Sequence, residues 1–296
     1  MQLAAIAAWR TFWKACSQRL RRTQRARDVT IDTVFSGSVP SLYDKYLGPL
    51  IFQPFADDLA RRLSASSQAR VLEIAAGTGI VTRALLGSLP TTVSIVATDL
   101  NQPMLDHAAA QTASSRVSWQ QADAQALPFA DCLFDVMVCQ FGAMFFPEKR
   151  KAYAEARRVL KPGGVFLFNV WDRIEENEFA DLVTTAVIDL FPGDPPVFLA
   201  RTPHGYFDKT EILEDLASAG FTDVRLETLA RRSLAASCRD PAVGYCQGTP
   251  LRNEIEARDA RRLAEATEAA ADRIGAKFGR GPVDGKIQAH VITAVR

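Results

Sequence analysis

From residue 69 onward, short segments rich in Val, Ile, Leu and Phe alternate with longer segments whose apolar residues recur at helical spacing. This alternation is typical of a parallel sheet that is covered by helices. The short segments are apolar on both faces, as expected for strands that are buried on both sides. The expected strands are 70–75, 92–98, 116–121, 134–139 and 164–170, and the expected helices are 79–88, 101–112 and 148–160. The predicted fold class is therefore α/β.

The pattern loosens after residue 172. Further helices are expected near 176–190 and 209–219, and further strands at 223–229 and 287–295. Between these two strands, the Ala- and Glu-rich segment 251–278 has the character of a helical insertion. Because the last strand would complete the same sheet, we expect one elaborated domain over 28–296.

The first 27 residues differ from the rest in charge. They contain seven basic residues and no acid, so that they carry +7 of a chain whose net charge is +1, and the remainder carries −6. Apolar residues at spacings of three or four would place a stripe opposite the arginines on a helix. We expect a solvated N-terminal extension, and the functional alternatives are a targeting peptide or weak association with an anionic membrane surface. No uncharged run reaches the length of a membrane-spanning helix.

Residue counts limit the chemistry of the chain. The near balance of 35 basic and 34 acidic residues gives no whole-chain reason to expect a nucleic-acid partner. The five cysteines form no C-x-x-C pair and the three histidines are far apart, so we expect neither a disulfide framework nor a metal site. A reducing cytoplasm is the predicted location.

A glycine-containing loop, Ala76-Gly77-Thr78-Gly79, follows the expected strand 70–75 directly. Ligands of open parallel sheets bind beyond the carboxyl ends of the strands, where glycines let them approach bare backbone. The loop is not a P-loop, because no Gly-Lys-Ser/Thr follows, and Thr82 occupies the third glycine position of a dinucleotide fingerprint. It is a candidate cofactor loop, although a lone G-x-G also occurs in structural turns.

Two acids follow the next two expected strands at the same edge of the sheet. Asp99 ends the second strand, where a carboxylate can accept hydrogen bonds from both hydroxyls of a ribose. The structural alternative is that Asp99 or Asn101 caps the following helix. Asp123 follows the third strand and could accept a hydrogen bond from an adenine amino group, although a lone Asp there is also a common turn residue.

Together these segments resemble the class I S-adenosylmethionine-dependent methyltransferases, in the order of that family. The matching segments are Val71–Gly79, Asp99, Asp123-Ala124, Phe134–Gly142 and Ala156–Gly164. The resemblance implies a Rossmann-like sheet of seven strands, mostly parallel with an antiparallel last strand, with helices on both faces, a helical lid and an insertion. It divides 28–296 into a lid (28–68), a cofactor core (69–172) and a substrate-shaping part (173–296).

The resemblance also assigns S-adenosylmethionine as the cofactor and implies which residues bind it. Glu73 would support the glycine loop, and the backbone at Ala75, Gly77 and Gly79 would hold the methionine part. The other implied contacts are Asp99 with the ribose, Leu100 and Met104 with the adenine face, Asp123 and Ala124 with the adenine edge, the Gln140 backbone beside the sulfonium, and the lid residue Tyr43. Ala75 departs from the family, which usually has glycine there, and we expect a tolerated variant.

The function implied is methyl transfer to a small-molecule acceptor, in the broad group that includes quinone-biosynthesis and natural-product enzymes. The alternatives are a non-catalytic S-adenosylmethionine-binding protein and, with less support, an NAD(P)-dependent oxidoreductase. A nucleic-acid methyltransferase is disfavoured by the acidic body of the chain and by the lack of an Asn-Pro-Pro-Tyr motif.

Methyl transfer depends mainly on alignment of the reactants, so no catalytic residue is assigned. If the acceptor needs a general base, the candidates by chemistry are His204, Tyr206, Tyr43 and His107, each of which also has a simpler structural interpretation. The segment after the fourth strand could form an apolar wall for the acceptor or belong to the core, and its residues are Phe141, Met144, Phe145 and Phe146.

Overall fold

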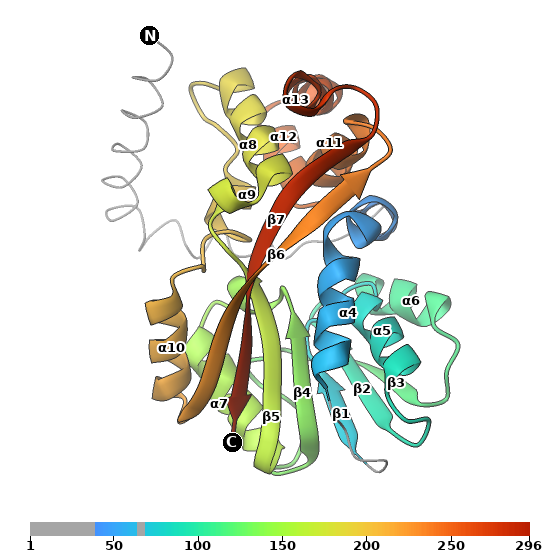
Figure 1. The fold of residues 1–296 in the computed structure, drawn as a ribbon, viewed down its shortest axis with the longest axis vertical. Helices are drawn as coiled ribbons and strands as arrows, with labels where there is room; N and C mark the ends of the chain where they lie inside the picture. Colours follow the sequence, from blue (N-terminus) through green and yellow to red (C-terminus); the bar gives the residue numbers. More distant parts are fainter. Residues whose placement is uncertain (1–38, 64–68) are drawn as a thin grey trace.

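The computed structural model describes residues 39–63 and 69–296, so the basic N-terminal extension of 1–27 lies outside the described residues. A seven-stranded sheet of order β3-β2-β1-β4-β5-β7-β6 forms its centre (Figure 1). The strands are β1 (Arg70–Glu73), β2 (Ser94–Asp99), β3 (Val117–Gln121), β4 (Phe134–Gln140), β5 (Leu160–Trp171), β6 (Asp223–Ala235) and β7 (Val283–Val295). Strands β1 to β5 pair in parallel, whereas β7 is antiparallel to both β5 and β6. The predicted Rossmann-like fold with an antiparallel last strand is confirmed.

Helices cover both faces of this sheet. Those on one face are α4 (Gln53–Arg62), α5 (Ile80–Ser88) and α6 (Gln102–Gln111), and those on the other are α7 (Lys149–Val159) and α10 (Lys209–Ser218) (Figure 1). Before α4, a short helix α3 (Val39–Leu42) continues into a π-helix, η1 (Tyr43–Phe52). Long π-helices are rare in proteins and frequently mark functional sites.

A second group of helices lies beyond the carboxyl ends of the parallel strands. Its members are α8 (Glu178–Leu190), α9 (Phe198–Arg201), α11 (Arg239–Gln247), α12 (Leu251–Asp259) and α13 (Leu263–Phe278), which we call the cap (Figure 1). Strands β6 and β7 pair over their whole length and extend to the cap, well beyond the predicted 223–229 and 287–295. The cap therefore encloses the edge of the sheet where ligands of this fold class bind.

Three local features differ from the sequence-based predictions. Strand β5 begins at Leu160, before the predicted strand 164–170, and its register against β4 shifts there, with Gly163 at a φ of 75°. The segment 251–278 is two helices separated by a 3₁₀ turn at Ala260–Arg262. Helix α11 was not predicted, because it contains Pro241 and Gly244; the glycine is needed since a Cβ there would lie 2.8 Å from a Leu47 methyl carbon.

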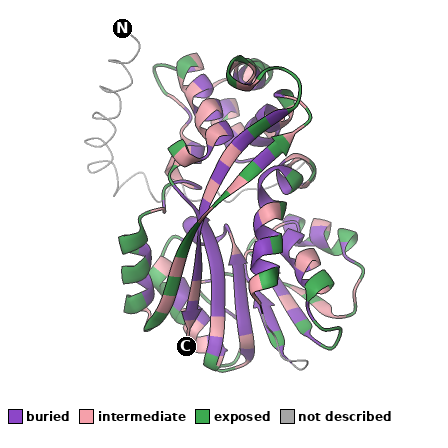
Figure 2. Ribbon diagram, in the orientation of Figure 1, coloured by how far each residue is buried: buried purple, intermediate pink, exposed green. Residues whose placement is uncertain are grey.

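Burial follows this arrangement closely. The central strands are buried through most of their length, whereas the edge strand β6 alternates between buried or half-buried and exposed residues (Figure 2). In the described ranges, no helix combines the length and the apolar character that crossing a bilayer requires.

Candidate active site

The loop after β1 takes a backbone conformation that favours glycine. Ala75, Gly77 and Gly79 all have positive φ, at 52°, 56° and 80°. A Cβ on Gly79 would also lie 3.0 Å from the Cβ of Ala108 on α6. The loop thus reverses direction tightly between β1 and α5, with Ala75 and Gly77 half-buried and Gly79 buried.

Asp99 closes this loop from the end of β2. Its Oδ2 accepts a hydrogen bond from the Gly77 amide at 2.9 Å, and its Oδ1 accepts one from the Asn101 amide at 2.8 Å. Burial raises the pKa of Asp99, and these backbone hydrogen bonds oppose the rise. The carboxylate therefore joins the glycine loop to the start of α6, which is a structural role, and its contact with a ribose stays a prediction.

A small cavity lies against this loop, with about 300 Å³ of empty space including its opening to solvent. Its lining residues are Tyr43, Phe52, Glu73, Ala75, Ala76, Gly77, Thr78, Ile80, Val81 and Gln140. Burial raises the pKa of Glu73 to about 8, and Oε2 of Glu73 accepts a hydrogen bond from the Thr82 hydroxyl at 2.6 Å. Gln140 donates to the Phe52 carbonyl at 3.3 Å, while its Oε1 is buried and has no partner within residues 39–63 and 69–296.

Helix η1 is fastened to the glycine loop by Asp44, which the sequence motifs did not single out. Oδ1 of Asp44 accepts hydrogen bonds from the Thr78 hydroxyl at 2.8 Å and from Arg83 at 3.2 Å. Nε2 of His107 lies 3.5 Å from Oδ2 of the same carboxylate. This contact holds η1 against α5 and brings Tyr43 close to Asp99, whose charge, after burial, raises the pKa of the tyrosine.

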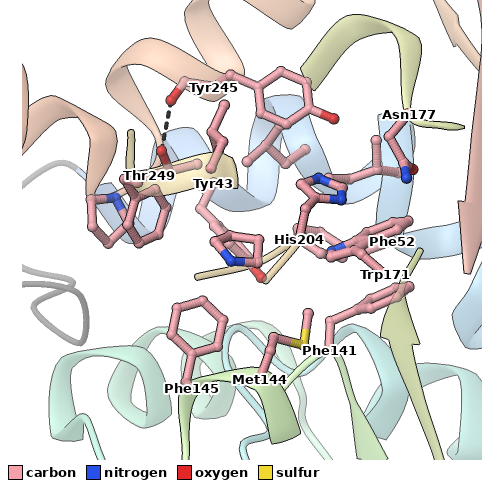
Figure 3. Close-up of a pocket in the computed structure, with 16 residues that line it drawn as sticks. Tyr43, Phe52, Phe141, Met144, Phe145, Trp171, Asn177, His204, Tyr245 and Thr249 are labelled. Carbon is pink, nitrogen blue, oxygen red and sulfur yellow. Dashed lines mark hydrogen bonds between the residues drawn. The ribbon is translucent and has the colours of Figure 1, made fainter. Parts of the chain in front are cut away.

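A larger cavity lies between the sheet and the cap, with about 550 Å³ of empty space including its opening (Figure 3). Aromatic and aliphatic side chains dominate its wall, and none of the described residues lining it carries a formal charge at neutral pH. The lining residues are Tyr43, Leu47, Ile51, Phe52, Phe141, Met144, Phe145, Trp171, Asn177, Phe198, Leu199, Pro203, His204, Tyr245, Thr249 and Pro250. Of the four residues for which both an acceptor wall and a core position were expected, Phe141, Met144 and Phe145 line this cavity and Phe146 does not. Phe141, Met144 and Phe146 also belong to the buried core.

Two stacked rings separate the cavities. Tyr43 and Phe52, at the two ends of η1, line both cavities, and their ring centroids are 4.7 Å apart. On the far side, Trp171 stacks flat on Phe141 at 3.6 Å. Ligands bound in the two cavities would therefore approach each other beside the rings of Tyr43 and Phe52.

The methyl group of Ala75 fits because Gly142, at the start of the segment after β4, has no side chain. A Cβ built on Gly142 would lie 2.4 Å from the Cβ of Ala75 and 2.8 Å from Sγ of Cys139. The alanine methyl thus occupies space left by a glycine elsewhere. The positive φ of Ala75 still costs about 1 to 2 kcal/mol, which explains why glycine is the usual residue in the family.

The four candidate bases differ in whether they line a cavity. His204 and Tyr43 line the large cavity, whereas His107 and Tyr206 line neither cavity. Tyr206 is buried, and its hydroxyl donates to Oδ2 of Asp215 at 3.0 Å. Tyr206 therefore has a structural role between α7 and α10.

The predicted adenine contacts lie outside the small cavity. Leu100 is 49% exposed, and the Met104 side chain lies 3.8 Å from where a Cβ on Gly77 would be. Asp123 is exposed and accepts a hydrogen bond from the Gln125 amide at 2.8 Å, as a turn residue does. The roles of Asp123 and its buried neighbour Ala124 in adenine binding stay predictions.

Comparisons with known proteins agree with this geometry. A family model described as a methyltransferase domain matches residues 72–168. An uncharacterised protein of Mycobacterium tuberculosis is 29% identical over 177 residues, which are 59% of this chain and 61% of that protein. A ubiquinone/menaquinone biosynthesis C-methyltransferase of Dinoroseobacter shibae is 39% identical over 188 residues, which are 56% of this chain and 72% of that protein.

The fold is shared with solved structures at low sequence identity. The phosphoethanolamine N-methyltransferase 2 of Haemonchus contortus, crystallised with S-adenosyl-L-methionine, superposes with a TM-score of 0.58 at 17% identity. The match covers 91% of this chain and 59% of that chain. At this identity the similarity concerns the fold alone.

Proposed function

Because this chain belongs to the class I S-adenosylmethionine-dependent methyltransferases, we propose that it transfers a methyl group to a small, uncharged, largely apolar acceptor. The observation that carries the proposal is the pair of cavities that meet at Tyr43 and Phe52. One is built from the family's cofactor motifs, and the other is walled mainly by apolar and aromatic residues. Two reactants held on either side of one aromatic pair are positioned for a direct transfer.

The residues of the small cavity fit S-adenosylmethionine. Within the lining, Gly77 offers backbone without a side chain, and Oε1 of Gln140 offers a buried acceptor that has no partner among the described residues. Asp99 lies outside the lining and accepts from the Gly77 amide, and its carboxylate oxygens would face the ribose hydroxyls. When bound, the cofactor supplies an activated methyl group on a sulfonium. The tasks left to the chain are to hold both reactants, to exclude water with the cap and to keep charge out of the acceptor cavity.

The proposal includes a cytoplasmic location and excludes a nucleic-acid partner. It is supported by Cys132, Cys139, Cys238 and Cys246, which are all free thiols, as suits a reducing compartment. A phosphate backbone would also find no cationic side chain among the described residues that line the large cavity.

The test is to identify what the protein retains and binds. Native mass spectrometry of the purified full chain should detect S-adenosylmethionine or S-adenosylhomocysteine, and calorimetry should show binding of S-adenosylhomocysteine but not of NAD⁺. Binding of the dinucleotide alone would contradict the proposal and favour an oxidoreductase.

A further inference from the structure

Six polar side chains line the large cavity, and two of them, Asn177 and Thr249, are already paired. The Asn177 side chain donates to the carbonyls of Asp172, Arg173 and Gln288, and its own carbonyl accepts from the Gln288 amide. The Thr249 hydroxyl donates to the Tyr245 carbonyl at 2.7 Å. These two side chains shape the wall and have little capacity left for a ligand.

His204 differs from them in having one paired and one unpaired ring nitrogen. Its Nδ1 lies 2.8 Å from the Asp172 carbonyl oxygen. Because a carbonyl can only accept, Nδ1 carries the hydrogen and Nε2 of the neutral ring carries a lone pair. Among the described residues Nε2 has no hydrogen-bond partner, and it is not sealed from the cavity as a buried orphan atom would be.

The loop that carries His204 is held rigidly. The His204 amide donates to the Leu199 carbonyl at 3.0 Å, and a Cβ on Gly205 would lie 2.0 Å from the Arg201 carbonyl oxygen. The imidazole lies 5.9 Å from the Trp171 ring, and Figure 3 shows it between the rings of Trp171 and Tyr245. Burial lowers the pKa of His204 to about 4, so the ring is neutral at neutral pH.

We propose that His204 is the specificity-determining hydrogen-bond acceptor of the large cavity, where its Nε2 selects neutral apolar molecules that present an O–H or N–H donor. This inference rests on the proposed function, because it names the class of acceptor that the methyltransferase takes. A molecule without a donor leaves the buried lone pair unpaired and binds less well. An anion loses its hydration in a cavity whose described wall offers no cation.

The first test determines the ring tautomer. The chain contains only three histidines, so ¹⁵N-detected imidazole spectra of the full chain at pH 7.5 are simple to assign with a His107→Gln variant and a His204→Gln variant. We expect His204 to be the Nδ1–H tautomer with an unprotonated Nε2 whose resonance shifts when 1-naphthol is added. An Nε2–H tautomer would overturn the proposal.

The second test compares probes that differ in one hydrogen-bond donor. In the presence of S-adenosylhomocysteine, we expect 1-naphthol to bind about 5- to 10-fold more tightly than 1-methoxynaphthalene, the effect of one net hydrogen bond, and 1-naphthoate to bind more weakly than both. His204→Phe and His204→Gln should remove or reduce the naphthol preference. Tyr206→Phe, which deletes a buried hydroxyl outside the cavity, is the matched control and should retain it.

The outcomes separate the two proposals. If S-adenosylhomocysteine does not bind the wild-type protein, the proposed function fails. If it binds and folded His204 variants keep the full preference for 1-naphthol, or if the wild-type protein shows none, only the role of His204 is overturned.

Discussion

The two cavities meet at the same pair of rings but are built in different ways. The small cavity takes most of its lining from one stretch, Glu73 to Val81, where β1, the glycine loop and α5 follow each other directly. The large cavity takes its lining from η1, the ends of β4 and β5, α9, α11 and the loops between them. The first is set by local backbone conformation, whereas the second exists only once the cap has packed on the sheet. This difference explains how one cofactor site can be combined with many acceptor sites on the same fold.

The largest effect is expected from Trp171→Ala in the wall of the large cavity. The ring is buried and packs flat on Phe141, so its loss should lower the free energy of unfolding by about 3 to 5 kcal/mol in urea titrations. Affinity of the folded fraction for S-adenosylhomocysteine should not change, whereas 1-naphthol binding should be lost. The control Phe145→Ala, at a half-buried position, should cost less stability. A parallel loss of cofactor affinity would show that the two cavities are not independent.

Gly142→Ala tests the contact between the segment after β4 and the loop that carries Ala75. The added methyl would lie 2.4 Å from that of Ala75, and such overpacking should cost about 1 to 3 kcal/mol of unfolding free energy. Ala75→Gly removes the clashing methyl and the strain of a positive φ, so the double variant should regain part of this loss. Strictly additive effects of the two changes would argue against the contact.

Asp99→Ala tests the proposed cofactor site at the end of β2, beside the small cavity. The loss of a carboxylate that binds the loop, and that we propose binds the ribose, should weaken S-adenosylhomocysteine binding by about 1 to 3 kcal/mol in calorimetry. Asp106→Ala, an exposed acid on α6, serves as the control and should bind normally. Unchanged affinity in the Asp99 variant would mean that the ribose lies elsewhere.

A smaller effect is expected on the free energy of unfolding, which should depend on pH through Glu73. Since burial raises its pKa from 4.5 to about 8, the unfolded chain ionises first, and stability should fall as pH rises between these two values. The slope from this one group is at most about 1.4 kcal/mol per pH unit. Urea titrations between pH 5.5 and 7.5 should show a shallower fall for Glu73→Gln than for the wild type, and equal slopes would contradict the assignment.

Features that depend on consecutive residues could be predicted from the sequence, whereas features that depend on packing between distant segments could not. The sheet, the glycine loop and Asp99 were predictable because each depends on a few consecutive residues at the end of a strand. The large cavity was not, since nothing local connects His204 with Trp171 or Tyr245. Helix α11 was hidden by its proline and glycine, and the Asp44 contact depends on η1 packing against α5. Gln140 lines the small cavity, and its predicted backbone contact with the cofactor stays a prediction.

The most direct measurement is a crystal structure of the full chain with S-adenosylhomocysteine bound. We predict the ribose hydroxyls on the Asp99 carboxylate, the amino acid part along the glycine loop, and the sulfur facing the Tyr43 and Phe52 rings. The opposite result is a nucleoside in the large cavity, among Phe141, Trp171 and His204. It would contradict the assignment of the small cavity to the cofactor and of the large cavity to the acceptor.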